Sequence, residues 1–224
     1  QISLDNFISN NPNKHGYFTV IQYDDGSLLT LPKNTVVYGA CSGDIPLPLI
    51  YQDINNTLHS IPKKKFNEKQ ILCSFVGTFT HTIRQKIYDT YKTNSEFDFT
   101  VVNNWSPVVD KNKQDSFITK TINSKFALAP RGYGRSSFRF FEIFQLGTIP
   151  IYIWDDIEWL PYKNIIDYDA FCISINISEI NNLYKILSSI NENTYNKMLQ
   201  EYEKIKKMFE LEGMSEFIIN NVNS

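Results

Sequence analysis

Short apolar runs alternate with amphipathic segments between residues 71 and 175, and this alternation most constrains how the chain can fold. Five of the runs are expected to be buried strands, at residues 71–76, 97–102, 125–129, 149–153 and 171–175. Helices are expected at about residues 83–91, 115–124, 137–147, 179–190, 193–211 and 214–221. Strands that alternate with helices form parallel βαβ units with helices on both sheet faces. The sequence therefore predicts an α/β fold built on one open, parallel, Rossmann-like sheet.

The first 60 residues have a different pattern and are expected to form a small, partial α/β portion. Strands are predicted at residues 17–23 and 35–39. Asp24, Asp25 and Gly26 form a turn after the first strand, and Pro46 and Pro48 force an extended segment later. The chain is therefore divided into residues 1–62, 63–212 and 213–224.

Composition excludes several classes of function. Lys and Arg number 22 against 24 Asp and Glu, so no global field attracts nucleic acid or an anionic membrane. No apolar run approaches the ~20 residues of a membrane span. The three cysteines, Cys41, Cys73 and Cys172, form no paired motif, so no structural zinc site is expected. The chain begins with Gln1 rather than Met and is expected to be a processed product or a fragment, which leaves its compartment open.

Two segments at the carboxyl ends of predicted strands carry unusual residues, and ligands of open parallel sheets bind at this edge. One runs from Gly77 through His81 to Arg84, and the other from Pro130 to Glu142. The second brings arginines, glycines and serines to the start of a helix, namely Arg131, Gly132, Gly134, Arg135, Ser136, Ser137 and Arg139. Glycines let the backbone approach a ligand, while helix N–H groups and arginines favour an anion. Because neither G-x-G-x-x-G nor a P-loop is present, the usual dinucleotide and triphosphatase interpretations fail.

Arg139 and Glu142 lie three residues apart on the helix that follows this loop. A carboxylate ~4.5 Å along the axis from a phosphate-binding helix start is placed to accept hydrogen bonds from ribose hydroxyls. The pattern is equally compatible with an exposed ion pair worth ~0.2–0.5 kcal/mol. The residues alone therefore leave both interpretations open.

The residue pattern of these segments resembles that of the exostosin family of glycosyltransferases. The resemblance lies in Lys125-Phe-Ala-Leu-Ala-Pro-Arg-Gly132, Ser137-Phe-Arg-Phe-Phe-Glu142, Gly147-Thr-Ile-Pro-Ile151 and Leu160-Pro161. It extends backwards to Phe75-Val-Gly77 with Arg84, and to Gly43-Asp44-Ile45-Pro46. In total it covers roughly residues 17–190.

Membership of this family implies a two-lobed, inverting glycosyltransferase of the GT-B type. Residues 63–212 would then be the lobe that binds a nucleotide sugar such as a UDP-sugar, and residues 1–62 part of the acceptor lobe. The family lacks the metal-binding D-x-D motif, so no metal cofactor is expected, and Asp167-Tyr168-Asp169 is interpreted as loop surface. Terminal helices of this fold cross back, so Met214, Phe217 and Ile218 are expected to pack on residues 1–60.

Direct displacement at a sugar's anomeric carbon needs stabilisation of the departing diphosphate and a base for the acceptor hydroxyl. The candidate donor-binding residues are Gly77, Arg84, Arg131, Gly132, Arg135, Ser136, Ser137, Arg139 and Glu142. Asp44 is the first choice as base, although a turn aspartate is the plainer interpretation. His15, Asp24 and Asp25 are weaker candidates, and His81 is expected to be exposed.

Two other functions compete with catalysis. The chain could be a catalytically silent, nucleotide-sugar-binding subunit that supports another glycosyltransferase, because few residues precede the predicted donor lobe. It could instead be an unrelated Rossmann-like module that binds phosphate. Transfer activity of the isolated chain would exclude the first, and binding of a nucleoside diphosphate would argue against the second.

Overall fold

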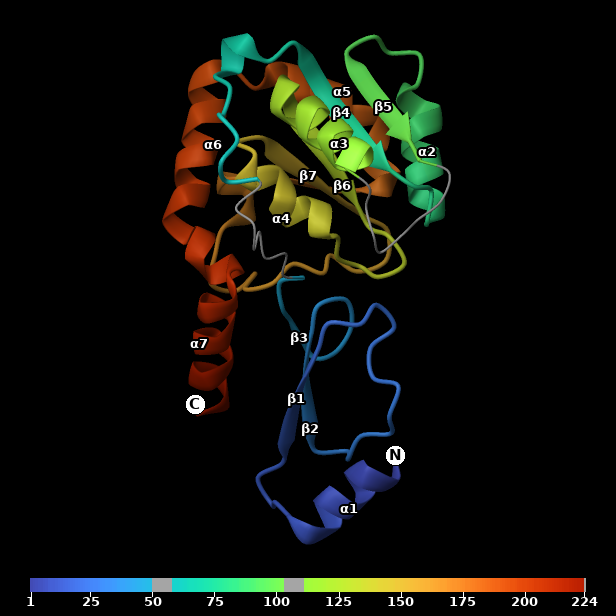
Figure 1. Cartoon of the computed structure of the whole chain (residues 1–224), viewed down its shortest axis with the longest axis vertical. Coiled ribbons are helices and arrows are strands. Elements are labelled where there is room, and N and C mark those ends of the chain that lie inside the picture. The colour runs from blue at the N-terminus through green and yellow to red at the C-terminus, as the bar shows by residue number, and fades with distance from the viewer. Residues whose placement is uncertain (50–57, 103–110, 224) are drawn as a thin grey trace.

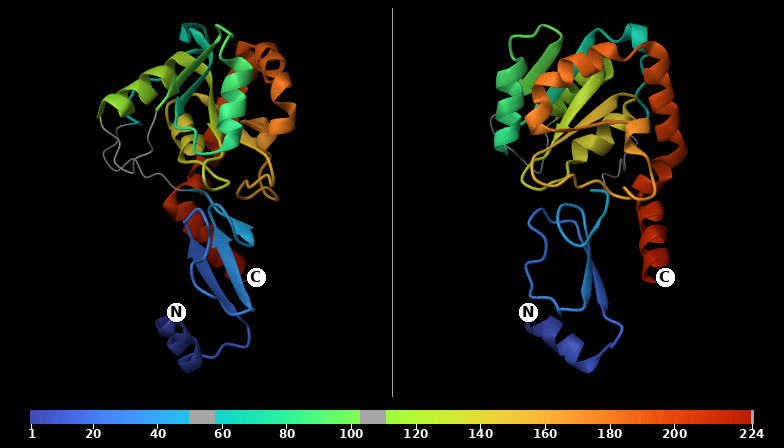
Figure 2. Two further views of the ribbon diagram at one scale, coloured as in Figure 1. Left: turned by 90° about the vertical axis from the view of Figure 1, so that its right-hand side faces the viewer. Right: turned by 180° about the vertical axis from the view of Figure 1, so that it is seen from behind.

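The computed structural model of the protein describes residues 1–49, 58–102 and 111–223. Residues 1–49 form one lobe, here called the N-terminal lobe, and residues 58–102 and 111–209 form a larger C-terminal lobe. The N-terminal lobe lies beneath the C-terminal lobe in the view of Figure 1. The other two views show the same end-to-end arrangement (Figure 2).

A five-stranded parallel sheet forms the centre of the C-terminal lobe, with strand order β5-β4-β6-β7-β8. Its strands are β4 (Ile71–Gly77), β5 (Phe97–Val101), β6 (Ser124–Pro130), β7 (Ile149–Trp154) and β8 (Ile173–Asn176). The helices of this lobe are α2 (Thr82–Tyr91), α3 (Lys111–Asn123), α4 (Phe138–Gln145), α5 (Leu183–Ser189) and α6 (Glu192–Ile205). The predicted Rossmann-like sheet of five strands is therefore confirmed.

Two apolar clusters pack on opposite faces of this sheet. On one face, Ile149, Ile151 and Ile153 of β7 join the buried residues of α2, α5 and α6. On the other face, Ala127 of β6 and Tyr152 of β7 join α3, α4 and the N-terminal lobe. Successive residues of β7 thus point to different clusters, as the alternation of side chains along a strand requires. Both faces are covered, which is typical of parallel sheets.

The N-terminal lobe is a second, smaller parallel sheet with strand order β1-β2-β3. Its strands are β1 (Tyr17–Ile21), β2 (Thr35–Gly39) and β3 (Ile45–Pro46), and helix α1 (Ile2–Asn10) precedes them. Sequence analysis did not predict α1. The helix buries none of its residues fully, and its partly buried Leu4 and Ile8 give only a weak periodic signal.

The C-terminal helix links the two lobes. Helix α6 ends at Ile205, a 3₁₀ turn follows over Lys206–Phe209, and α7 (Leu211–Val222) runs alongside the N-terminal sheet (Figures 1 and 2). Met214 and Ile218 are buried in the same cluster as Tyr38 of β2, whose hydroxyl donates to Oδ1 of Asn221 at 2.6 Å. Phe217 instead packs edge-on against Tyr162 of the C-terminal lobe, with ring centroids 4.6 Å apart. The helix therefore contacts both lobes.

Candidate functional site

The candidate site lies where the strand order of the large sheet reverses. From β4 the chain moves outward to β5 and then returns past β4 to form β6. Ligands of doubly wound sheets bind in the crevice outside the carboxyl ends of the strands at such a switch point. The loop 78–81 after β4 and the loop 131–137 after β6 both leave the sheet at this edge. These are the two segments that sequence analysis singled out.

Arg84 ties the two loops together. Its Nη1 donates to the carbonyl of Thr78 at 2.9 Å, while Nε and Nη2 donate to the carbonyls of Arg131 and Pro130 at 2.8 and 3.0 Å. Burial and the nearby charge of Arg139 lower the pKa of Arg84 to about 10, so it stays protonated at neutral pH. Arg84 therefore holds the two loops together by hydrogen bonds and also contributes positive charge to the site.

Gly132 of the loop after β6 lies close to Arg84 and to Thr80 of the loop after β4. A Cβ there would lie 3.1 Å from Nη2 of Arg84 and 3.4 Å from Oγ1 of Thr80. That Thr80 hydroxyl is buried and has no hydrogen-bond partner within the described residues. Because buried polar groups are almost always hydrogen-bonded, this hydroxyl is a candidate contact for a ligand or an ordered water.

Two aspartates at the end of β7 hold the arginines of the loop. Nη1 of Arg131 lies 2.8 Å from Oδ1 of Asp155 and 2.9 Å from Oδ1 of Asp156. Nε and Nη2 of Arg135 both lie 2.8 Å from Oδ2 of Asp156. On the far side, Nε2 of His81 lies 3.7 Å from Oδ2 of Asp155. The loops after β4, β6 and β7 thus share one charged network.

The pKa values within this network follow its pairing. Burial would raise the pKa of Asp156, but the hydrogen bonds from Arg135 and the Ile157 N–H, with the charge of Arg131, hold it well below its usual range. Burial would lower the pKa of Arg131, yet its contacts with Asp155 and Asp156 raise it overall. Asp156 and Arg131 are therefore both ionised at neutral pH.

Glu142 and Arg139 form a second ion pair, one turn into α4. Nη1 of Arg139 lies 2.5 Å from Oε2 of Glu142, and its Cζ lies 3.7 Å from the ring centroid of Phe117. Glu142 is only 8% exposed. The structure thus forms the ion pair that the sequence left open, but the pair is partly buried rather than exposed, and its arginine also contacts the Phe117 ring.

The start of α4 is not capped by a side chain. Ser137 occupies the N-cap position without a side-chain hydrogen bond to the first turn, and it is itself buried. The neighbouring Ser136 uses its backbone to hydrogen-bond the thiol of Cys41 in the N-terminal lobe. An uncapped helix start keeps its N–H groups available for an anion.

The N-terminal lobe contacts the loop 131–137, here called the arginine loop, at Gly134. A Cβ at this position would lie 2.4 Å from Sγ of Cys41 and 2.6 Å from Oδ1 of Asp24, so only glycine fits. The Cys41 thiol donates to Oδ1 of Asp24 at 3.4 Å. Beside this contact, Nε1 of Trp159 donates to the carbonyl of Gly39 at 3.2 Å. The loop is therefore held between the two lobes.

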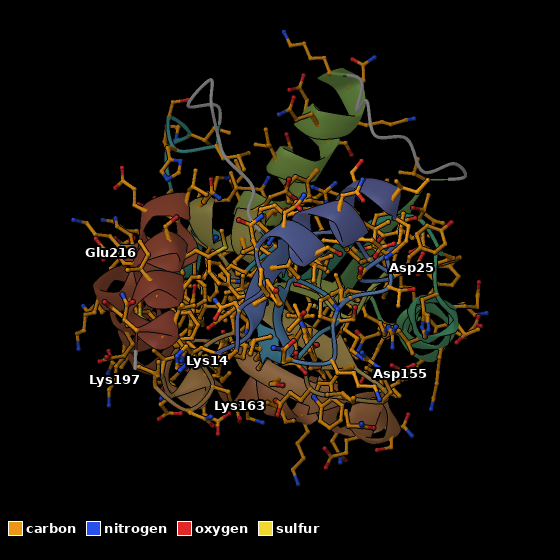
Figure 3. The ribbon with its side chains drawn as sticks, turned by 90° about the horizontal axis from the view of Figure 1, so that it is seen from below. Lys14, Asp25, Asp155, Lys163, Lys197 and Glu216 are labelled. Atoms are coloured by element: carbon orange, nitrogen blue, oxygen red, sulfur yellow. The ribbon has the colours of Figure 1, made fainter. Side chains whose placement is uncertain are left out.

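The candidate bases lie in different surroundings. Asp24 is half-buried and adjoins the arginine loop, whereas the exposed Asp44 accepts a hydrogen bond from the Val37 N–H at 2.8 Å. His15 is exposed and contributes to a surface pocket with Lys14 and Tyr17. Figure 3 shows Asp25 and Asp155 on the same side of the molecule, far from Lys14.

His81 differs from its expected exposed state. It is only partly exposed and caps α2, where its Nδ1 accepts a hydrogen bond from the Ile83 N–H at 3.4 Å. The helix start recruits this histidine because its first N–H groups need acceptors.

Sequence analysis missed the role of Asp155 and Asp156. Their signal was available, because an Asp-Asp pair directly follows the strand at 149–153 and so lies at the ligand-binding edge. Trp159 was also missed, and no local pattern marks its contact with Gly39. The triplet at residues 167–169 lies on a 3₁₀ turn, with Asp167 and Asp169 exposed.

Across residues 1–49, 58–102 and 111–223, no three His, Cys, Asp or Glu side chains gather as metal ligands would. Within the same ranges, no helix has both the length and the apolar character needed to cross a bilayer.

Comparison with known proteins identifies the family. The Exostosin GT47 domain matches residues 8–190, which is most of the chain. The chain belongs to the exostosin GT47 family. A probable glycosyltransferase of Arabidopsis thaliana is 25% identical over 167 residues, covering 73% of this chain and 33% of that protein. The Exostosin-1 homolog of Caenorhabditis elegans is 25% identical over 211 residues, covering 77% of this chain and 54% of that protein.

The exostosin GT47 assignment agrees with the fold. The crystal structure of TarM superposes with a TM-score of 0.52 over 99% of this chain and 53% of that chain, at 13% sequence identity. At this identity the likeness shows the fold alone, which is the Rossmann-like, GT-B-type architecture expected from the sequence. The exostosin chain described here spans between about a third and about half of the length of the two relatives above. The roles of its site residues stay predictions.

Proposed function

We propose that the C-terminal lobe binds a UDP-sugar at the switch point and that the protein transfers the sugar to a glycan acceptor with inversion. The observation that carries this proposal is the nearly buried Glu142 carboxylate, one turn inside an uncapped helix that contains Arg139 and whose approach loop contains Arg131 and Arg135. The helix start and loop suit a diphosphate, and Glu142 suits the adjoining ribose hydroxyls. Family membership supports the transferase activity.

Each group at the site has a role in this proposal. The backbone at Gly77 and Gly132 permits close approach of the nucleotide, and Ser136 and Ser137 line the helix start. Arg131, Arg135 and Arg139, with Arg84 behind them, stabilise the charge that develops on the departing diphosphate. Because these fixed cations are present, we propose that transfer needs no divalent metal and no other cofactor.

The acceptor hydroxyl must lose its proton as the new glycosidic bond forms and the bond to the diphosphate breaks. We propose that a carboxylate of the N-terminal lobe accepts this proton as the general base. Asp24 is favoured over Asp44, the choice made from sequence, because Asp24 adjoins the arginine loop at Gly134 while Asp44 is engaged by the Val37 backbone. A base must come within hydrogen-bond reach of the reacting hydroxyl.

A second candidate is a nucleotide-sugar-binding subunit that supports another glycosyltransferase. It is favoured by the small N-terminal sheet of three strands beside a full donor lobe of five. Both candidates require the same donor site and differ only in turnover. Transfer by the purified chain alone, with a panel of UDP-sugars and glycan acceptors, separates them.

Calorimetric titration of UDP, 2′-deoxy-UDP and uridine tests the donor site. Glu142→Ala removes a charge-assisted hydrogen bond worth ~1.5–3 kcal/mol, so UDP affinity should fall roughly 10–150-fold. The wild type should bind 2′-deoxy-UDP more weakly than UDP by a similar factor, because the 2′-hydroxyl is missing. Glu142→Ala should bind the two ligands almost equally well. Arg139→Ala should weaken UDP much more than uridine. Glu216→Ala, on an exposed face of α7, is the matched control and should change nothing.

Two results would reject the proposal. Equal UDP affinity in the wild type and in Glu142→Ala would end the ribose assignment. A thermal shift with UDP that appears only with Mg²⁺ or Mn²⁺, and vanishes in EDTA, would overturn metal independence.

A further inference from the structure

Asp156 joins two arginines of the candidate site through different oxygens. Its Oδ1 accepts a hydrogen bond from Nη1 of Arg131 at 2.9 Å. Its Oδ2 lies 2.8 Å from both Nε and Nη2 of Arg135. The two arginines come from the loop after β6, and Asp156 comes from the end of β7. One carboxylate therefore fixes the spacing between two guanidinium groups of a neighbouring loop.

The turn that carries Asp156 is itself fixed. The Ile157 N–H donates to Oδ1 of Asp156 at 2.7 Å, and the Asp156 N–H donates to Oδ1 of Asp155 at 3.0 Å. Arg135 is held further by Trp159, whose ring centroid lies 5.7 Å from the guanidinium Cζ. This fixed arrangement occupies Nε and Nη2 of Arg135 and leaves its Nη1 outside these contacts.

Two opposite effects on an anionic ligand follow from Asp156. Its negative charge competes with a diphosphate for the arginines, but its hydrogen bonds remove the rotamer freedom that two long side chains would otherwise lose on binding. The Asp156 side chain is 40% exposed, against 13% for Arg131. Solvent screens the competing charge at an exposed carboxylate, whereas the geometry it imposes on the buried guanidinium is unscreened. The positioning effect should therefore prevail.

We propose that Asp156 is a positioning residue of the donor site, which orients Arg131 and Arg135 toward the diphosphate of the nucleotide sugar. This inference rests on the proposed function and extends it to a residue that does not itself contact the donor. Asp156→Asn tests it, because one of the two acceptor oxygens becomes an NH₂ donor, which cannot accept a hydrogen bond from the guanidinium group that faces it.

The experiment measures the affinities of UDP, uridine and inorganic pyrophosphate for the wild type, Asp156→Asn, Arg135→Lys and the double variant. Residues that orient metal ligands change metal affinity by about 10–100-fold when altered, and we take the lower end of this range for a residue that orients guanidinium groups. UDP and pyrophosphate should therefore bind Asp156→Asn about tenfold more weakly, while uridine binding stays unchanged. In the Arg135→Lys background the same substitution should reduce affinity less, because only the contact with Arg131 remains to be lost.

The matched control is Asp169→Asn, which alters an exposed carboxylate of the same lobe and should leave all three affinities unchanged. Tighter UDP binding in Asp156→Asn would show that Asp156 is a competing charge and would overturn the proposal. An equal loss for UDP and uridine, with a lower melting temperature, would show a purely structural role and would also overturn it.

The two proposals fail in distinguishable ways. If the wild type binds pyrophosphate but not UDP, the nucleotide-sugar function fails, and a pyrophosphate affinity that drops in Asp156→Asn still supports positioning. If the wild type binds UDP and Asp156→Asn binds it equally well, only the positioning role fails. Binding of neither probe overturns both.

Discussion

Nη1 of Arg139 lies 2.5 Å from Oε2 of Glu142, and the Glu142 side chain is 11% exposed while that of Arg139 is 29% exposed. The pair spans one turn of α4 and is closed on the other side by the Phe117 ring. A nearly buried carboxylate needs its counter-ion, because an unpaired buried charge is costly. The pair thus has a structural role in addition to any contact with ribose.

The first prediction concerns this structural role. Arg139→Ala leaves Glu142 without its ion-pair partner and should lower the free energy of unfolding by ~1–3 kcal/mol at neutral pH. The Arg139→Ala/Glu142→Gln double variant removes the unpaired charge and should recover part of that loss. Urea denaturation measures both. A double variant less stable than Arg139→Ala would contradict the pairing.

The second prediction concerns Gly134, where the lobes meet. Gly134→Ala should destabilise the protein by ~1–3 kcal/mol, because its new Cβ overlaps Sγ of Cys41 and Oδ1 of Asp24. Thermal unfolding measures this loss. In a Cys41→Ala background the sulfur is gone, so the same substitution should cost less. An equal cost in both backgrounds would show that the sulfur is not the atom that excludes a side chain at this position.

The third prediction compares the two carboxylates of the N-terminal lobe. Asp24→Asn should lower the turnover of sugar transfer by ~10²–10⁴-fold, which is the usual contribution of a general base, with UDP affinity little changed. Asp44→Asn should retain most of the turnover. Steady-state transfer assays with matched UDP titrations decide between them. The reverse pattern would restore Asp44 as the base.

The fourth prediction concerns Lys69, which is 4% exposed and donates to Oγ1 of Thr148 and the carbonyl of Ile122 at 2.9 and 3.1 Å. Burial, with a smaller contribution from Lys64, lowers the pKa of Lys69 from 10.5 to about 7. Between these two values the folded protein holds a neutral lysine and the unfolded chain a charged one. Unfolding then takes up a proton, so stability should rise with pH.

The test is the difference in unfolding free energy between the wild type and Lys69→Met, measured from pH 6 to pH 10. Titrating groups common to both proteins cancel in this difference. The wild type should gain stability relative to the variant above about pH 7, by at most ~1.4 kcal/mol per pH unit, and no further change should appear below that pH. A difference that is flat with pH would contradict the lowered pKa.

The sequence by itself determined the large sheet and the edge at which we propose that a ligand binds. Hydrophobic periodicity and helix-start residues are local signals, so they marked all five strands of the C-terminal lobe and its main helices. Long helices were placed less well, because tertiary packing decides where they end. The predicted helix at 193–211 stops at Ile205, and the 3₁₀ turn that follows buries Phe209 among the rings of Phe141, Tyr162 and Tyr202.

Only the tertiary structure decided which groups the site residues contact. Sequence identified Arg84, Arg131 and Arg135 as anion-binding candidates, and the fold directs Arg84 to backbone carbonyls and the other two to Asp155 and Asp156. These partners lie up to 47 residues apart in the chain and meet because the strand order brings the loops after β4, β6 and β7 to one edge. Local sequence carries the type of each side chain, but the pairing of charges across loops depends on crossovers that no local pattern encodes.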